Sequence, residues 1–160
     1  MQTKLCLGTA QFGMNYGITN FYGKPKDKEI DLIIEYALKN DICYFDTANA
    51  YGDSEITLGN KLKHKNVKFI TKFNSGVKNS FTEKDINNLD LKFNKTLKKL
   101  KTNNIDSYLL HDASDMKKTN NHLFINWLNT LKLKGKINRL GISIYEESDL
   151  ENIPLNQIEV

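Results

Sequence analysis

Four side chains of different chemical kinds each follow a short apolar run in this sequence. Asp46 and Tyr51 lie in the stretch FDTANAYGDSE (residues 45–55), Lys72 ends VKFITK, and His111 ends IDSYLLH. Carboxylate, phenol, ammonium and imidazole groups are the ones with which proteins move protons to and from a substrate. Proton-transfer chemistry in this chain therefore depends on whether the fold brings these four groups together.

Short apolar runs alternate with helical patterns along the whole chain. Apolar residues at 30, 33, 34, 37 and 38 predict an amphipathic helix over 27–40, with Asp27 as its N-cap. Thr82 and Asp85 have the spacing of a capping box at the start of a helix over 82–101. Further helices are predicted over 54–62 and 121–135, a short helix or turn over 147–153, and strands over 4–10, 42–46, 67–72, 105–111, 137–143 and 156–160.

This alternation predicts an α/β fold with a parallel sheet and covering helices. Two architectures fit it: a doubly wound open sheet and part of a (β/α)8 barrel. The stretch GTAQFG after the first strand is not the GxGxxG fingerprint of the doubly wound dinucleotide-binding fold, which favours the barrel. Because parallel strands end on one face, Asp46, Lys72, His111 and Ser143 are expected on one rim, with Tyr51 on the loop beside them.

Length and composition predict one globular domain. The chain has 160 residues, of which 39% are hydrophobic and 26% charged, which is too short for two ordinary domains. No apolar run approaches the roughly 18 to 20 residues of a membrane span, and the first residues do not have the pattern of a secretory signal. A cytoplasmic protein is therefore expected. Cys6 and Cys43 lie in apolar runs and are predicted to be reduced core residues.

The net charge of +4 does not predict a nucleic-acid partner. Arg139 is the single arginine, and the lysines are spread along the chain. In the densest basic stretch, 92–101, Phe93, Leu97 and Leu100 recur at helical spacing, so the lysines between them are expected on the solvated face. His111, Asp112 and Asp115 are not interpreted as metal ligands. Of the other candidates, His64 and His122 are expected on the surface, Trp127 in the core, and Glu55 where it favours a helix dipole.

The sequence resembles the aldo-keto reductases. The resemblance rests on FDTANAYGDSEITLG, on ITK about twenty residues later and on YLLH beyond that, and GKINRLGIS also matches the stretch before that family's fifth strand. It extends from LGTAQFG to the last residue, and it implies the N-terminal part of a (β/α)8 barrel. By this resemblance Asp46, Tyr51, Lys72 and His111 are the catalytic tetrad of an oxidoreductase that reduces aldehydes or ketones to alcohols.

The resemblance also implies a cofactor and a substrate site. The expected cofactor is NADPH, with NADH as the alternative, and no metal is expected. The residues predicted to contact the cofactor are Gly8, Thr9, Asp46 and Ser143. Phe12 and Tyr16, on the first loop, are predicted to line the pocket of a small carbonyl substrate, for which a sugar-like compound is one option. No nucleic-acid or membrane partner is expected.

The proposed tetrad has a chemical rationale. Hydride transfer to a carbonyl leaves an alkoxide, which needs a proton, and Tyr51 is the predicted donor. Lowering the pKa of a phenol from about 10 by roughly three units takes about 4 kcal/mol. An ammonium group about 4 Å away supplies about that much at an intermediate dielectric, so Lys72 is predicted to lower the pKa of Tyr51. Asp46 would orient Lys72 and partly offset its charge, and His111 would donate a hydrogen bond to the substrate oxygen.

The chain departs from the family pattern in length and after the fifth strand. A complete (β/α)8 barrel needs about 250 residues. Residues 1–160 are therefore interpreted as a single domain truncated on its C-terminal side, with five βα units and a sixth strand. Family members often have Ser-Asn where this chain has Ser143 and Ile144. Self-association through the open sheet edges is an expected consequence of an unclosed barrel.

Three hypotheses about activity remain at this point. In the first, the chain is the N-terminal part of a working NADPH-dependent reductase. In the second, it is a truncated, catalytically incompetent fragment that lacks the loops for the cofactor phosphates. In the third, it belongs to a different barrel enzyme, an isomerase or aldolase that uses Lys72 as a Schiff base, although the 45–55 stretch argues against this.

Overall fold

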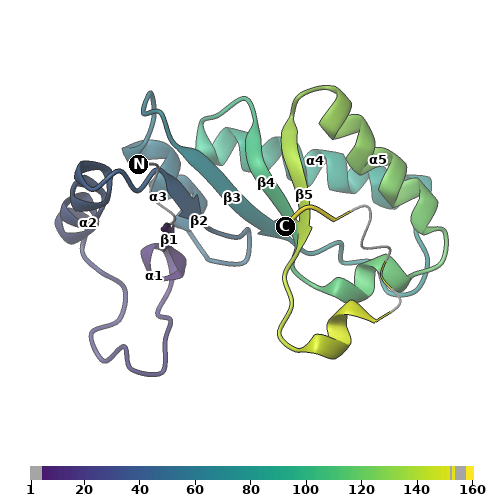
Figure 1. Cartoon of the computed structure of the whole chain (residues 1–160), viewed down its shortest axis with the longest axis horizontal. Coiled ribbons are helices and arrows are strands. Elements are labelled where there is room, and N and C mark those ends of the chain that lie inside the picture. The colour runs from purple at the N-terminus through teal and green to yellow at the C-terminus, as the bar shows by residue number, and fades with distance from the viewer. Residues whose placement is uncertain (1–4, 152, 154–157) are drawn as a thin grey trace.

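A parallel β-sheet forms the middle of the molecule (Figure 1). The structure is a computed structural model that describes residues 5–151, 153 and 158–160. Strands that are neighbours in the described sheet are also neighbours in the sequence. They are β1 (Cys6–Gly8), β2 (Tyr44–Asp46), β3 (Lys68–Phe73), β4 (Ile105–Leu110) and β5 (Ile137–Ile142).

The helices connect the strands and cover one side of the sheet. Figure 1 shows α4 behind the strands and α5 to the right of β5, and it shows no labelled helix in front of β3, β4 and β5. A doubly wound sheet reverses its strand order and carries helices on both faces, so this unbroken order favours an arc of a barrel. The helices are α1 (Ala10–Gly13), α2 (Asp27–Lys39), α3 (Ser54–Lys61), α4 (Glu83–Leu100) and α5 (Asn121–Leu133), with the 3-10 turns η1 (Ala113–Lys117) and η2 (Glu147–Leu150).

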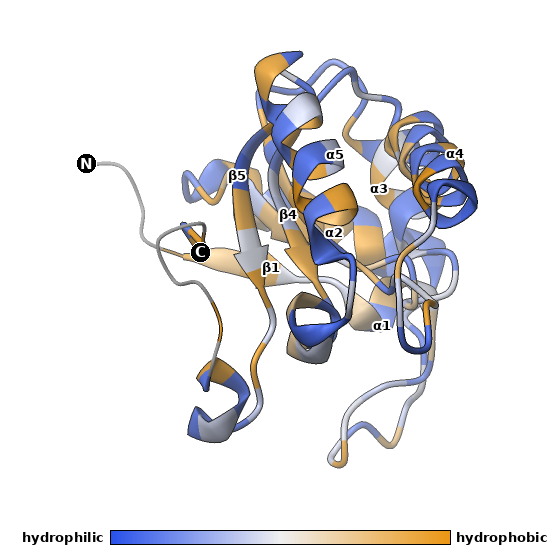
Figure 2. Cartoon of the chain, turned by 90° about the vertical axis from the view of Figure 1, so that its right-hand side faces the viewer, coloured by the Kyte–Doolittle hydropathy of each residue, from blue (hydrophilic) through white to orange (hydrophobic). Residues whose placement is uncertain are grey.

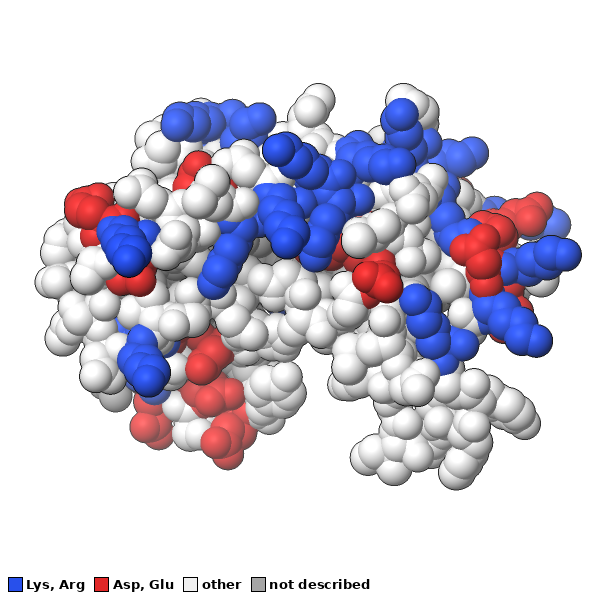
Figure 3. Space-filling model, turned by 180° about the vertical axis from the view of Figure 1, so that it is seen from behind, with Lys and Arg blue, Asp and Glu red and all other residues white. Residues whose placement is uncertain are grey.

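Helix α4 illustrates how sequence determines an element here. Its N-terminus has the predicted capping box, in which the Asp85 backbone amide donates to the Thr82 hydroxyl and the Thr82 backbone amide donates to the Asp85 carboxylate. Phe93, Leu97 and Leu100 are buried, as the spacing predicts. Polar residues follow the outer side of α4 in Figure 2, and on the back of the molecule the blue Lys and Arg side chains gather over the upper half (Figure 3).

The core lies between the sheet and the helices and is rich in aromatic rings. Phe73 of β3 stacks on Tyr108 of β4 with ring centroids 4.2 Å apart. Phe93 of α4 and Trp127 of α5 contact Tyr108 edge-on. Trp127 is therefore a core residue, as the sequence predicts, and its indole Nε1 donates to Asp90 at 3.3 Å. This cluster joins the two central strands to their two covering helices.

Two predictions of local structure were wrong. The first strand ends at Gly8, and the residues after it form α1, a single turn that the loop-like glycines of this stretch concealed. Asp27 is the first residue of α2 rather than its N-cap. The N-cap is Lys26, whose backbone amide donates to the Glu29 carboxylate at 2.6 Å.

The prediction of two core cysteines was also wrong. Both thiols are free, but Cys6 is exposed and Cys43 is half-buried. The reason for the first is topological, because β1 is an edge strand with a neighbour on one side only. An apolar sequence around a cysteine cannot reveal that its strand lies at the edge of an open sheet.

The last described residues run beside β5. The Glu159 backbone amide donates to Leu140 O at 2.9 Å, and the Ile142 amide donates to Val160 O at 3.1 Å. The predicted sixth strand over 156–160 lies partly outside the described residues, which resume at 158. Among the helices that the structure describes, none has the length and apolar character needed to cross a membrane.

Candidate active site

The predicted site residues lie at the C-terminal ends of successive parallel strands. Asp46 is the last residue of β2, Lys72 the penultimate residue of β3, and His111 and Ser143 directly follow β4 and β5. The ladder continues past each strand: the His111 amide donates to Phe73 O at 2.9 Å, and the Ser143 amide to Leu110 O at 2.8 Å. Regular parallel pairing therefore positions these residues along one edge of the sheet, at the bottom of Figure 1.

Lys72 and Asp46 form the expected ion pair. The Lys72 ammonium lies 2.6 Å from both carboxylate oxygens of Asp46 and also donates to the backbone carbonyl of Thr47 at 3.2 Å. The Lys72 residue is 8% exposed, whereas Asp46 is half-buried. A cation with three acceptors in a shielded position is held in one orientation, so the pair fixes the charge distribution at this edge of the sheet.

Tyr51 and His111 extend the ion pair into a four-residue cluster. The Lys72 ammonium nitrogen lies 5.3 Å from the centroid of the Tyr51 ring. The rings of Tyr51 and His111 meet edge to face with centroids 6.1 Å apart. Tyr51 reaches this place because the chain turns sharply after Thr47, with Tyr51 N donating to Ala48 O at 3.0 Å and Gly52 at a φ of 53°.

The pKa of the Tyr51 phenol is raised rather than lowered. Burial is the main cause, and the negative charge of Asp46 adds to it, as do Tyr16 and Tyr145. The prediction that Lys72 lowers this pKa is therefore wrong for the protein alone. The physical reason is that both oxygens of Asp46 neutralise Lys72, which leaves burial to dominate. Tyr51 is consequently a neutral hydroxyl at neutral pH.

His111 is held in its neutral form. Burial and the nearby Lys72 cation lower its pKa, although Asp46 and Asp112 act in the opposite direction. Its Nδ1 atom is buried and has no hydrogen-bond partner among the described residues. A neutral imidazole has one N–H donor, so His111 can donate a hydrogen bond without carrying a charge.

A cavity of about 400 Å³ opens beside Asp46 and Tyr51. Gly8 supplies open space in it, because a Cβ atom at this position would meet nothing within 4 Å. In Figure 3 the lower edge of the molecule is hollowed between two lobes, on the side where the strands end. The cavity is lined by Gly8, Thr9, Ala10, Gln11, Tyr16, Asp46 and Tyr51.

The remaining predicted contact residues lie in different surroundings. Tyr16 lines the cavity, and its ring centroid lies 6.2 Å from that of Tyr51. Phe12 does not line it: the residue is 3% exposed and packs in the hydrophobic core, so its predicted place in the substrate pocket is not supported. Thr9 is at the cavity floor with no exposed surface, and its hydroxyl already bonds Asp46 O at 2.8 Å. Ser143 is half-buried.

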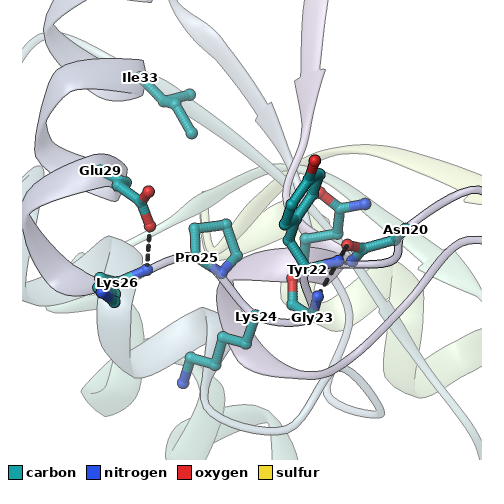
Figure 4. Close-up of a pocket in the computed structure, with 9 residues that line it drawn as sticks. Asn20, Tyr22, Gly23, Lys24, Pro25, Lys26, Glu29 and Ile33 are labelled. Atoms are coloured by element: carbon teal, nitrogen blue, oxygen red, sulfur yellow. Dashed lines mark hydrogen bonds between the residues drawn. The ribbon is translucent and has the colours of Figure 1, made fainter.

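A second cavity, of about 490 Å³, lies between the first loop and α2 (Figure 4). Asn20, Tyr22 and Pro25 of the loop line it together with Glu29 and Ile33 of α2. None of the four clustered residues lines this cavity, and its Glu29 carboxylate already accepts from the Lys26 amide. The smaller cavity is therefore the better candidate for a catalytic site.

Sequence reasoning missed a buried ion pair between α3 and α4. Glu55, in the first turn of α3, is 1% exposed, accepts a hydrogen bond from the Thr71 hydroxyl at 3.0 Å and pairs with Lys99 of α4 at 3.2 Å. Its position near a helix start gave no signal that α4 would cover it. Across the described part of the chain, His, Cys, Asp and Glu side chains form no group of three that could hold a metal ion.

The chain is similar to known proteins over nearly its whole length. The model of the Aldo/keto reductase family matches residues 4–159. No curated protein sequence matched. Among solved structures, a Pseudomonas aeruginosa protein assigned to the aldo-keto reductases is 27% identical, with a TM-score of 0.67. The match covers 86% of this chain and 54% of the Pseudomonas aeruginosa chain.

Two further structures show the same fold at lower identity. An aldo-keto reductase from Bacillus halodurans is 22% identical with a TM-score of 0.70, over 98% of this chain and 50% of its own. An aldo-keto reductase from Klebsiella pneumoniae, solved in complex with NADPH, is 20% identical with a TM-score of 0.62, over 90% of this chain and 46% of its own. The chain thus spans about half the length of these proteins, and its sheet is an incomplete (β/α)8 barrel. Together with the family match, the fold shows that the chain belongs to the aldo/keto reductase family.

Proposed function

We propose that this chain carries the catalytic residues of an NADPH-dependent reductase that converts an aldehyde or ketone to an alcohol. The observation that supports it most strongly is the cluster at the cavity. The Lys72 ammonium is held by Asp46 at 2.6 Å and faces the Tyr51 ring at 5.3 Å, with His111 edge-on to the same ring. These are the four residues that the family resemblance assigns to catalysis.

Tyr51 is the proton donor in this proposal. Its raised pKa keeps the hydroxyl protonated at neutral pH, which a donor requires. The alkoxide formed from a carbonyl is a much stronger base than a phenolate, so proton transfer to it is favourable even from a phenol of raised pKa. The Lys72 cation then stabilises the resulting phenolate, and Asp46 holds that cation in place.

His111 positions the substrate in this proposal. It is neutral, its ring lies edge-on to Tyr51, and it can offer one N–H to the carbonyl oxygen. A donor from His111 and a donor from Tyr51 on one oxygen orient the carbonyl and polarise it before reduction. The cavity beside Tyr51 has room for a small substrate, and Tyr16 forms one of its walls.

The described residues fit the nicotinamide end of the cofactor. Gly8 presents bare backbone to the open cavity, so a flat ring can approach the end of β1 closely. Asp46 and Ser143 lie at the strand ends that would face the same ring. When bound, NADPH supplies the hydride. This assignment draws support from the NADPH complex of the Klebsiella pneumoniae relative, and NADH remains the alternative.

Replacing Tyr51 by phenylalanine tests the proposed donor. In a preparation of the protein with measurable carbonyl reduction, Tyr51→Phe should lower kcat by about 100-fold or more, because general acid catalysis typically contributes that much. NADPH binding should change little, since the ring remains. The matched control is Tyr36→Phe, a substitution on α2 at an exposed residue, which should leave kcat unchanged. Near-normal kcat in Tyr51→Phe would rule out the assignment.

The alternative proposal is that the chain is a fragment without a competent cofactor site. The difference in length between this chain and its relatives supports this alternative. Because the chain spans about half of its relatives, we expect the 160-residue chain alone to bind NADPH weakly or not at all. Calorimetric titration of the purified chain measures this. Micromolar binding to a monomer would contradict the expectation and would mean that residues of this chain hold the cofactor phosphates.

Three further assignments stay predictions. A sugar-like carbonyl substrate would be tested by comparing kcat/KM for sugar aldehydes and for apolar aldehydes. Self-association through the open edge at β1 would be tested by sedimentation at several concentrations. A cytoplasmic location would be tested by fractionating cells that express the protein.

A further inference from the structure

Three buried hydroxyl groups meet directly beneath the candidate site. Thr9, Thr47 and Ser54 each have no exposed surface, and we call them the hydroxyl cluster. The Thr9 hydroxyl donates to Asp46 O at 2.8 Å, the Thr47 hydroxyl donates to Ser54 Oγ at 3.0 Å, and the Ser54 hydroxyl donates to Thr9 O at 2.8 Å. Each proton is used once, and Thr9 Oγ1 lies a further 2.9 Å from Ser54 Oγ. The cluster is therefore satisfied without water.

The hydroxyl cluster joins three elements that are distant in sequence. Thr9 follows β1, Thr47 follows β2, and Ser54 is the first residue of α3. The segment 48–53, which carries Tyr51, is flanked by two members of the cluster, Thr47 and Ser54. Ser54 is not acting as a helix cap, because the N-cap of α3 is Asp53 and no side chain caps this helix. Its hydroxyl is thus available for the contacts that hold the two ends of this segment together.

A backbone contact constrains the same segment from the other side. A Cβ atom on Gly13 would lie 1.7 Å from Tyr51 O, and one on Gly52 would lie 2.4 Å from Gly13 O. The end of α1 and the Tyr51 turn therefore touch backbone to backbone, with no room for a side chain between them. The hydroxyl cluster holds both ends of the segment 48–53, and Gly13 contacts its middle. Tyr51 therefore has little freedom to move.

We propose that Ser54 and Thr47 are positioning residues for the proton donor: their buried hydroxyls fix the Tyr51 turn relative to Asp46 and Lys72. This inference rests on the proposed function of Tyr51. The link to the ion pair is direct, because the Thr47 carbonyl accepts from Lys72 at 3.2 Å while the Thr47 hydroxyl donates to Ser54. One residue thus connects the cluster to the cation that faces the Tyr51 ring.

The test separates the hydroxyls from simple packing. Ser54→Ala removes the centre of the cluster, Thr47→Val removes one hydroxyl while keeping the side-chain shape, and Thr47→Ser keeps the hydroxyl. We expect Ser54→Ala to lower kcat about tenfold or more with KM changed less than threefold, because small misplacements of a catalytic group are costly. Thr47→Val should change kcat in the same direction, and Thr47→Ser should restore it.

A second readout does not depend on catalysis. In the 160-residue chain labelled with ¹³C-tyrosine, the Tyr51 NMR signal can be assigned by its loss in Tyr51→Phe. Ser54→Ala and Thr47→Val should move the Tyr51 titration toward the ordinary value of about 10, because a loosened turn admits water. Thr47→Ser should leave it in place. This readout keeps the inference testable if the wild-type chain proves to have no carbonyl reductase activity.

Defined results would overturn the inference. If Ser54→Ala keeps kcat within twofold and leaves the Tyr51 signal unchanged, the cluster does not position the donor. If Thr47→Ser loses as much kcat as Thr47→Val, retaining the hydroxyl does not preserve the site, and the assignment of the effect to the Thr47 hydroxyl is wrong. If Ser54→Ala does not fold, the Thr47 pair, which alters one contact only, decides the matter.

Discussion

The centre and the edge of the sheet are built from similar residues and differ in how many neighbours cover them. Leu110 of β4 has a strand on each side and is 0% exposed. Leu7 of β1 has one neighbouring strand and is half-buried, and Cys6 beside it is exposed. The sequence is apolar in both places, but the position of the strand in the sheet determines how much of a residue's surface is shielded from water.

The candidate site spans this difference. Lys72 lies in β3 and His111 directly follows β4, both near the centre of the sheet, whereas Gly8 belongs to the edge strand β1. Tyr51 is held by contacts with Gly13, which comes shortly after β1. The centre is stabilised by helices and aromatic rings, and the edge is held mainly by hydrogen bonds of buried hydroxyls and by close backbone contacts. The comparison predicts that substitutions of packed apolar residues at the centre mainly lower stability, and that substitutions of the buried hydroxyls near the edge mainly affect the site.

The largest effect is expected from a matched pair of leucine substitutions. Leu110→Ala should lower the free energy of unfolding by about 3 to 4 kcal/mol, because it leaves a cavity in a fully buried place. Leu7→Ala should cost about 1 kcal/mol, because that residue is half-buried. Urea unfolding of both variants measures the difference. Equal losses would mean that the edge strand is as well packed as the centre.

A smaller loss is expected when the buried ion pair of α3 and α4 is broken. Lys99→Met leaves the Glu55 carboxylate, at 1% exposure, with the Thr71 hydroxyl as its remaining hydrogen-bond partner among the described residues. Because Lys99 itself is partly exposed, we expect a loss of about 2 kcal/mol rather than the 3 to 5 of a fully buried pair. The control Lys98→Met, at an exposed lysine on the same helix, should change stability by less than about 0.5 kcal/mol.

The dependence of stability on pH in the acid range reports on Asp106 of β4, which pairs with Lys68 of β3 and Arg139 of β5. Burial raises its pKa, but hydrogen bonds from Arg139 and Ser107 and the charges of Arg139 and Lys68 outweigh burial, so the pKa is lowered. The ionised form is therefore favoured by folding. Its stabilisation is present above the ordinary pKa of about 4 and is lost as the pH falls through the lowered folded value.

Asp106→Asn should consequently cost about 1 kcal/mol at pH 7, the size of one net charged hydrogen bond near the surface. The difference between wild type and variant should shrink when the pH is lowered below about 4. Urea midpoints at pH 7 and pH 3 measure it. A difference that grows on acidification would contradict the assigned sign.

The parts of the structure that sequence predicts best are those set by local periodicity. The helices α2, α4 and α5 and the alternation of strands and helices along the chain follow from apolar spacing and from the capping box at Thr82 and Asp85. The rim positions of Asp46, Lys72 and His111 follow from one rule, that parallel strands end on one face. The catalytic roles of these residues stay predictions.

What the sequence could not show depends on contacts between distant segments. The burial of Glu55 arises because α4 packs over α3, and the raised pKa of Tyr51 arises because its phenol is buried and lies near the negative charge of Asp46. The core position of Phe12 follows from α1, a single helical turn with too few residues to have a periodic signal. In each case the missing information is which segment lies next to which.

The smallest effect is expected at the edge thiol. Cys6→Ser should change the free energy of unfolding by less than about 0.5 kcal/mol, since the residue is exposed and no core contact is lost.

The thiol should nevertheless react slowly, because local burial and the Asp46 charge raise its pKa to about 11. At pH 8 such a thiol is about 0.1% ionised, so alkylation should be on the order of 100-fold slower than for a free cysteine. Mass spectrometry of the Cys43→Ser variant measures this rate. Asp46→Asn should increase it, because the variant removes a negative charge and leaves Lys72 without its counter-ion, and an unchanged rate would mean that the rim charges do not reach the edge strand.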